Sequence, residues 1–124
     1  MERIYVFPAT EYEPETPVKL EWSFYSKNLK LSLRLIAESP YCKGDWSEPF
    51  ITATVNLPES SALPEDVQFV KEKDFWNIGG WLEDNGIAEP TPLVVTSGHE
   101  SFRAYRFHVP EDVLNRITGL ETRF

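Results

Sequence analysis

KEKDFWNIGGWLEDNGIAEPTP, residues 71–92, predicts a single internal helix over about residues 74–85. Asp74 is a suitable N-cap because its carboxylate can accept a hydrogen bond from a free backbone N–H of the first turn. Gly86 provides the left-handed residue that commonly ends a helix, and the prolines at 90 and 92 disfavour further helix. Spacings of three and four place three apolar residues on one face, which we expect to pack on a sheet: Phe75, Ile78 and Leu82.

The segments before this helix alternate between apolar and polar residues with the period of two that is typical of strands. Residues 18–24 and 29–35 alternate on either side of a short turn, so we expect an antiparallel hairpin with one solvated face. Residues 50–57, FITATVNL, are rich in β-branched residues and predict a third strand. Its expected inner face consists of Ile51, Ala53, Val55 and Leu57. Shorter β-favouring runs lie at residues 3–7 and 93–96.

A second, shorter helix is predicted near the C-terminal end of the chain, over about residues 110–118. Pro110 suits the first turn of a helix, and Glu111 and Asp112 favour its positive end. Gly119 is expected to end this helix. The apolar stripe of the helix consists of Val113, Leu114 and Ile117.

The predicted fold class is α+β: an antiparallel sheet of about five strands with one central helix (about 74–85) and a short C-terminal helix (about 110–118) packed on it. Residues 102–109 supply a strand, which we expect at an edge or only partly covered because each of its faces carries an arginine. A chain of 124 residues fits one domain, here residues 1–124. Residues 8–17 are predicted to be an acidic, proline-containing connector.

The net charge is −8, and the acidity is concentrated in residues 59–89, which carry eight acidic and two basic side chains. A phosphate backbone would be repelled by that surface, so we expect no direct binding of nucleic acid. No apolar stretch approaches the roughly 20 residues of a membrane span, and residues 1–15 show no secretory signal. Cys42 is the only cysteine, which fits a reducing compartment, so we expect a cytoplasmic protein.

Residue types used in catalysis and metal binding are present, but they form no recognised motif. His99 and His108 lack further ligands at a compatible spacing for a metal site. Cys42 has no identified base that would make it a nucleophile. Gly79 and Gly80 lack the lysine of a phosphate loop, and their simpler role is to let the helix approach the sheet closely. We therefore expect no catalytic residue, no cofactor and no metal.

Two tryptophans of the predicted helix flank its apolar face, and three acids lie at or just beyond its C-terminal end. Tryptophans at the rim of a core are common interface anchors, although core packing is the more frequent role of large aromatics. Acids beside the negative end of a helix dipole cost stability, so a function would explain them, whereas solvent screening makes that cost small. The candidate protein-binding residues are Trp76, Trp81, Glu83, Asp84 and Glu89.

Short motifs in this chain resemble those of a family of uncharacterised bacterial proteins, a domain of unknown function often encoded on plasmids and integrative elements. The motifs are ITATVNLP at 51–58, WLEDNGIAEPT at 81–91, Ser97–Gly98, and Tyr105–Arg106–Phe107. The chain differs from the family pattern at residues 87–88 and 92–93. The resemblance covers roughly residues 50–108 and implies an accessory protein of a mobile element, with no assigned catalytic residues.

The leading hypothesis is a non-enzymatic, cytoplasmic accessory protein that acts by binding another protein. The alternative is an acidic DNA mimic that inhibits a host defence nuclease, and its support is the cluster of acids in residues 59–89. A third hypothesis is an enzyme that uses Cys42 or His99. Phosphate mimicry predicts a basic partner whose binding is sensitive to salt, which separates the alternative from the leading hypothesis.

Overall fold

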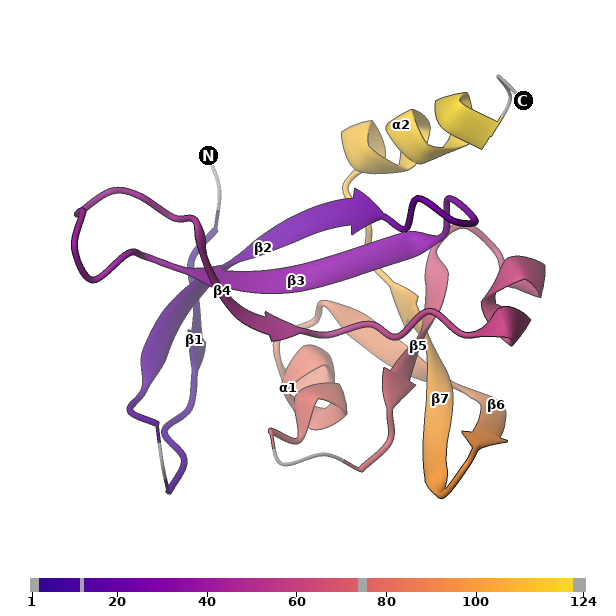
Figure 1. Ribbon diagram of the computed structural model, residues 1–124, viewed down its shortest axis with the longest axis horizontal. Coiled ribbons are helices and arrows are strands. Elements are labelled where there is room, and N and C mark those ends of the chain that lie inside the picture. The colour runs from indigo at the N-terminus through magenta and orange to yellow at the C-terminus, as the bar shows by residue number, and fades with distance from the viewer. Residues whose placement is uncertain (1–2, 12, 74–75, 122–124) are drawn as a thin grey trace.

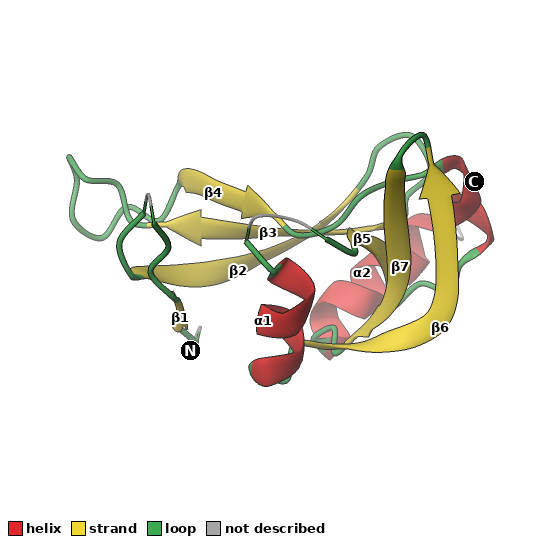
Figure 2. Ribbon diagram, turned by 90° about the horizontal axis from the view of Figure 1, so that it is seen from below, coloured by secondary structure: helices red, strands yellow, loops and turns green. Residues whose placement is uncertain are grey.

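The computed structural model describes residues 3–11, 13–73 and 76–121, with side chains described up to residue 116. Its elements are β1 (Tyr5–Phe7), β2 (Thr16–Phe24), β3 (Leu31–Ala37), β4 (Glu48–Thr52), the 3-10 helix η1 (Pro58–Ala62), β5 (Val67–Lys71), α1 (Ile78–Asp84), β6 (Ala88–Ser97), β7 (Glu100–Phe107) and α2 (Glu111–Glu121). The strands form two antiparallel sheets, in the orders β1-β2-β3-β4 and β5-β7-β6. Strands of the second sheet run across those of the first in two perpendicular views (Figures 1 and 2).

The α+β class is confirmed, but the prediction of a single sheet of about five strands is wrong. The β-rich run at residues 50–57 shows why. β4 ends at Thr52, and beyond it an isolated bridge connects Val55 to Phe69 of β5 in the second sheet. Ile51 lies in the larger core cluster, whereas Val55 packs on the smaller one. The run therefore passes from one sheet to the other instead of forming one long strand.

The predicted hairpin is confirmed: β2 and β3 pair antiparallel from Lys19 opposite Ile36 to Phe24 opposite Leu31. On its outer face, Glu21 and Arg34 form an ion pair between opposite residues. The inner face is formed by alternate apolar residues, which are Val18, Leu20, Trp22 and Phe24 on β2 and Leu31, Leu33 and Leu35 on β3.

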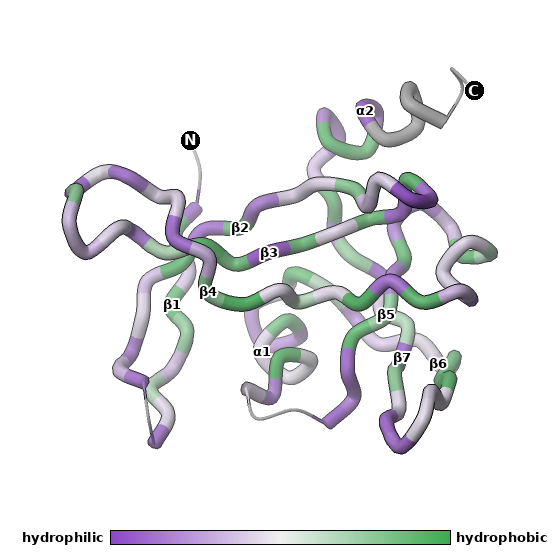
Figure 3. The backbone as a smooth tube through the Cα atoms, in the orientation of Figure 1, coloured by the Kyte–Doolittle hydropathy of each residue, from purple (hydrophilic) through white to green (hydrophobic). Residues whose placement is uncertain are grey.

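The N-terminal strand β1 pairs with β2 over three residues, and the connector between the two strands is shorter than predicted. Residues 16–17 belong to β2, so the connector runs from residue 8 to residue 15. Figure 3 shows this connection in mostly hydrophilic colours, as its acidic sequence leads one to expect.

The sequence predicts residues 102–109 at an edge or only partly covered, and the edge position is wrong because β7 is the central strand of the second sheet, although Arg106 on it is exposed. Each of its two arginines reaches a carboxylate contributed by another part of the chain. Arg103 Nη2 lies 2.9 Å from Glu72 Oε1, and Arg106 Nη1 lies 2.9 Å from Asp66 Oδ2. These pairs let a central strand carry one arginine on each face.

Helix α1 begins at Ile78, later than predicted, with Asn77 at its N-cap in a left-handed conformation (φ 48°). The proposed cap Asp74 and the neighbouring Phe75 lie outside the described residues. The rest of the prediction holds: Ile78 and Leu82 are buried, and Gly86 adopts the left-handed conformation (φ 67°) just after the helix.

Two boundaries near the C-terminal end also differ from the predicted ones. β6 is longer than residues 93–96 because it includes Pro90 and Pro92; it lies at a sheet edge, and its register shifts between Pro90 and Val94. Proline is tolerated at such edges and bulges because no ladder hydrogen bond is lost there. α2 continues through Gly119 to Glu121, so Gly119 does not end it. In the described residues, no helix is long and apolar enough to cross a membrane.

Gly79 allows α1 to lie directly against the second sheet. A methyl group at Gly79 would overlap the hydroxyl of Tyr105 on β7, whereas one at Gly80 would meet only the Asn77 side chain, 2.7 Å from its Nδ2 atom. The expected close approach of helix and sheet is therefore confirmed for Gly79, and Gly80 has a different neighbour.

We expect Gly79→Ala to be less stable than Gly80→Ala by about 1–3 kcal/mol, because overpacking against a buried ring forces the helix away from the sheet. Both substitutions gain the same helix propensity, so the comparison isolates the contact with the sheet. Urea unfolding of the two variants gives this difference. Equal free energies of unfolding for the two variants would contradict this expectation. Adding Tyr105→Phe to the Gly79→Ala protein should recover part of its lost stability, because the overlapping hydroxyl is removed.

Candidate functional site

Trp81, a candidate binding residue, is buried and joins α1 to the N-terminal strand. Its side chain is 6% exposed, and its indole Nε1 donates a hydrogen bond to the Val6 carbonyl at 2.9 Å. The ring centroid lies 5.2 Å from that of Phe7 and 5.9 Å from that of Tyr5. The contacts of Trp81 are therefore those of a core residue, and little of its surface is left for a partner.

Trp76 is half-buried just before α1 and packs on the same aromatic cluster. Its ring lies 5.8 Å from Phe7 and 5.6 Å from Phe50, measured between centroids. The two tryptophans thus hold β1 and β4 against α1. Core packing, the simpler of the two interpretations of these residues, accounts for the contacts that both of them make.

The three candidate acids do not share one face of the second sheet. Glu83 belongs to α1, and its charge acts on the phenol of Tyr105, which lies on the sheet face that α1 covers. Glu89 is opposite Arg106 on β7, and because neighbouring residues of a strand point to opposite faces, it lies on the other face from Tyr105. Asp84 is exposed at the C-terminal end of α1.

Tyr105 shows how one of these acids acts inside the fold. Burial raises the pKa of the Tyr105 phenol above its ordinary value, and the negative charge of Glu83 raises that pKa further. The charge of Glu83 on α1 therefore acts on a buried residue of β7, inside the fold.

The acidic stretch of residues 59–89 is partly neutralised by bases from β7. Asp66 and Glu72 pair with Arg106 and Arg103, as described above. Because these pairs balance two of its eight acids, the stretch is less suited to imitating a run of phosphates than its composition indicates.

The cysteine and the histidines lie apart from one another. Cys42 is exposed in the loop between β3 and β4. His99 precedes β7 and His108 follows it, so the two imidazoles are at opposite ends of that strand. Across the described ranges, no group of three or more His, Cys, Asp or Glu side chains is placed to hold a metal ion.

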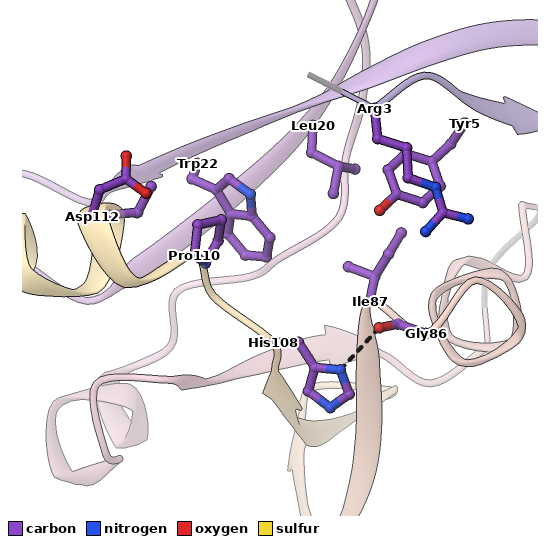
Figure 4. Close-up of a pocket in the computed structure, with 10 residues that line it drawn as sticks. Arg3, Tyr5, Leu20, Trp22, Gly86, Ile87, His108, Pro110 and Asp112 are labelled. Atoms are coloured by element: carbon purple, nitrogen blue, oxygen red, sulfur yellow. Dashed lines mark hydrogen bonds between the residues drawn. The ribbon is translucent and has the colours of Figure 1, made fainter. Parts of the chain in front are cut away.

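A cleft of about 510 Å³ lies where the two sheets diverge, and its residues come from four separate segments of the chain (Figure 4). The first two segments contribute Arg3 and Tyr5, and Leu20 and Trp22 of β2. The other two contribute Gly86 and Ile87, and the run from His108 and Pro110 into the first turn of α2, with Asp112 and Val113. The volume is within the range of about 300–1,000 Å³ that is usual for ligand sites.

The floor of this cleft is apolar and incompletely covered. Leu20 and Trp22 point to the inner face of the first sheet, yet both are only half-buried. Trp22 packs edge-on against Phe107 of β7, with the ring centroids 6.1 Å apart, and it also lines the cleft. Ile87 and Val113 complete the floor and are buried.

Opposite charges lie at the two ends of the cleft, as Figure 4 shows. The guanidinium carbon of Arg3 is 4.6 Å from the centroid of the Tyr5 ring, which orients the cation at one end. Asp112, in the first turn of α2, is exposed at the other end. Between them, the Nδ1 atom of His108 is 2.9 Å from the Gly86 carbonyl, which fixes the imidazole on the wall.

Sequence analysis did not identify this cleft. Its only signal was the alternation in β2, which places Leu20 and Trp22 on one face. The remaining residues lie far apart in the sequence, and tertiary packing brings them together. The sequence pattern suggests a metal-ligand role to test for His108 and a charge that favours the positive end of the C-terminal helix for Asp112.

Comparisons with known proteins give one family and no individual relative. Neither a curated protein nor a solved structure matches the chain. A model of a family described as a domain of unknown function matches residues 19–120. These residues include every motif that carried the resemblance in the sequence, and they leave out β1 and the first three residues of β2. The chain therefore belongs to the family described as Domain of unknown function (DUF4313).

Proposed function

We propose that this protein acts by binding another protein, without catalysis, and that a segment of the partner lies in the cleft between the two sheets. The observation that carries the proposal is the half-buried floor of Leu20 and Trp22. These residues occupy core-facing positions on β2, yet the core covers them only in part, which leaves apolar surface inside a concave site. An aromatic in a concave site with polar groups at its ends is typical of the anchor positions of protein interfaces.

The lining favours binding over chemistry. Its described residues include no serine, cysteine or lysine that would act as a conventional nucleophile. The imidazole of His108 is engaged through Nδ1 with the Gly86 carbonyl. What the cleft offers is apolar surface between two charged ends.

Phosphate mimicry by the acidic stretch has less support. It requires acids arranged along one surface, whereas Glu83 and Glu89 lie on opposite faces of the second sheet and Asp66 is paired with Arg106. As part of the same proposal, we assign the protein an accessory role on a mobile element and a cytoplasmic location. Both rest on the sequence motifs and on the single cysteine.

Site-specific crosslinking tests the proposed site directly. Tyr5 lines the cleft, whereas Tyr41 is 96% exposed in the loop between β3 and β4. Either tyrosine is replaced with the photoreactive residue p-benzoylphenylalanine. Because the same aromatic side chain is exchanged at both positions, the two crosslinking results can be compared directly. In cells that carry the gene, we expect irradiation to give a discrete protein adduct from position 5 and none from position 41.

The crosslinking result needs a variant that blocks the cleft. Adding Leu20→Lys to the position 5 protein should reduce the adduct at least fivefold, because a charge on the floor would lose its water when the partner binds. Circular dichroism checks that this variant stays folded. An adduct that forms equally with and without Leu20→Lys, or one from position 41 alone, would contradict binding in the cleft.

A further inference from the structure

The cleft differs at its two ends, so an extended ligand bound along it would have a preferred direction. Arg3 and Tyr5 mark the end next to β1, and Asp112 marks the end next to α2 (Figure 4). The apolar floor lies between them. An extended peptide presents side chains in sequence along its length, so it can place an acid, an apolar side chain and a base opposite these positive, apolar and negative groups.

Arg3 is available to bind an anion. Within the part of the chain that the structure describes, the contact made by its guanidinium is the face of the Tyr5 ring. That contact orients the cation and leaves its N–H groups free to donate to a carboxylate, a pairing whose planar geometry suits arginine. The side chain is exposed, so a partner reaches it without opening the fold.

Asp112 provides the complementary charge. A carboxylate in the first turn of α2 also stabilises that helix through its dipole, and Glu111 occupies the same turn. Asp112 lines the cleft, whereas Glu111 is not among its lining residues. Glu111 therefore provides a control that has the same effect on the helix but lies outside the cleft.

We propose that the cleft selects an extended peptide segment that carries an acidic residue for Arg3, an aromatic or aliphatic residue for the floor, and a basic residue for Asp112. This inference rests on the proposed function, because it names the chemistry of the partner segment bound at the same site. The volume of about 510 Å³ accommodates one short stretch of a partner rather than a folded domain.

Selection from a phage library of random decapeptides tests this order of groups. The protein is immobilised as the full chain, and bound peptides are sequenced. We expect enriched peptides to combine an acid, an aromatic or aliphatic residue and a base in one order. Arg3→Glu should reverse the acidic preference to a basic one, and Asp112→Lys should reverse the basic preference to an acidic one.

Matched variants separate the site from overall charge. Lys43→Glu changes the net charge as Arg3→Glu does, at an exposed loop position, and Glu111→Lys changes α2 as Asp112→Lys does. Neither control should alter the selected pattern. In fluorescence polarisation, a selected peptide should bind the Arg3→Glu protein about fivefold more weakly, as loss of an exposed ion pair predicts. Replacing the acid of that peptide by lysine should restore the affinity.

Different results of the peptide selection would overturn the inference alone or the proposed function as well. Selected peptides without a charge pattern, or a pattern that Arg3→Glu leaves unchanged, would overturn this inference while leaving binding in the cleft intact. Failure to enrich any peptide above the level obtained with the Leu20→Lys protein would overturn the inference together with the proposed function. The inference is supported if the Arg3→Glu protein selects peptides with a base in place of the acid, while the Lys43→Glu protein selects the same pattern as the unmodified protein.

Discussion

Trp81→Ala is expected to lower the free energy of unfolding by about 3–5 kcal/mol, as is usual when a buried tryptophan is truncated to alanine. The side chain is 6% exposed and packs on Phe7, the innermost residue of β1. Its removal leaves a cavity between α1 and β1 and takes away the hydrogen-bond donor to the Val6 carbonyl. Urea unfolding measured by circular dichroism gives the change.

Trp81→Phe separates the two contributions. Phenylalanine keeps an aromatic ring in contact with Phe7 but has no N–H for the Val6 carbonyl, so we expect a loss of about 1–2 kcal/mol from that hydrogen bond and the smaller ring. Truncation of a buried tryptophan usually costs several kcal/mol. If the free energies of unfolding of the Trp81→Ala and unmodified proteins differed by less than about 1 kcal/mol, α1 would not hold β1 as the structure indicates.

The local elements were predictable because local pattern determines them. The alternation in residues 18–35 predicts the β2–β3 hairpin and its inner face, and Gly86 predicts the end of α1. Each of these depends on residues that are close in sequence. The start of α1 was less predictable: Asn77 begins it in a left-handed conformation, which its sequence neighbours do not signal.

The arrangement of the sheets was not predictable because it depends on pairings between distant residues. Residues 50–57 read as one strand, yet the bridge from Val55 to Phe69 turns their second half toward another sheet. Arginines on both faces of β7 indicated an exposed edge. Asp66 and Glu72, which precede β7 by more than 25 positions, let that strand lie in the centre.

For the candidate binding residues too, local sequence predicts some features, and contacts with distant residues determine the others. Trp76 and Trp81 were both predicted to flank the apolar face of the helix, but Trp76 lies just before α1, and sequence alone did not show that both would pack against β1. Trp22 of the first sheet is half-buried and lines the cleft. We therefore propose the cleft, where residues from four segments meet, and not α1 as the site.

A buried polar network explains part of the family motif at residues 51–58. Gln68 on β5 is fully buried, and its Oε1 accepts a hydrogen bond of 2.7 Å from the Ser60 hydroxyl of η1. Its Nε2 donates to the Leu31 carbonyl of β3 at 3.1 Å and to Asn56 Oδ1 at 3.4 Å. One amide thus connects both sheets and the Asn56–Leu57–Pro58 turn that joins them.

Gln68→Leu is expected to destabilise the protein by about 2–5 kcal/mol, although leucine has a similar volume. The cost arises because the Ser60 hydroxyl loses its acceptor and the Leu31 carbonyl loses a donor, and each unsatisfied buried group costs about 1–3 kcal/mol. Ser60→Ala alone should cost less, about 1–3 kcal/mol, and the double variant should lose less than the sum of the two, because both changes break the same hydrogen bond. Urea unfolding of the unmodified protein, the two single variants and the double variant gives the coupling energy between Gln68 and Ser60. Strict additivity would mean that Gln68 and Ser60 act independently, and the network would then not be the connection between the sheets.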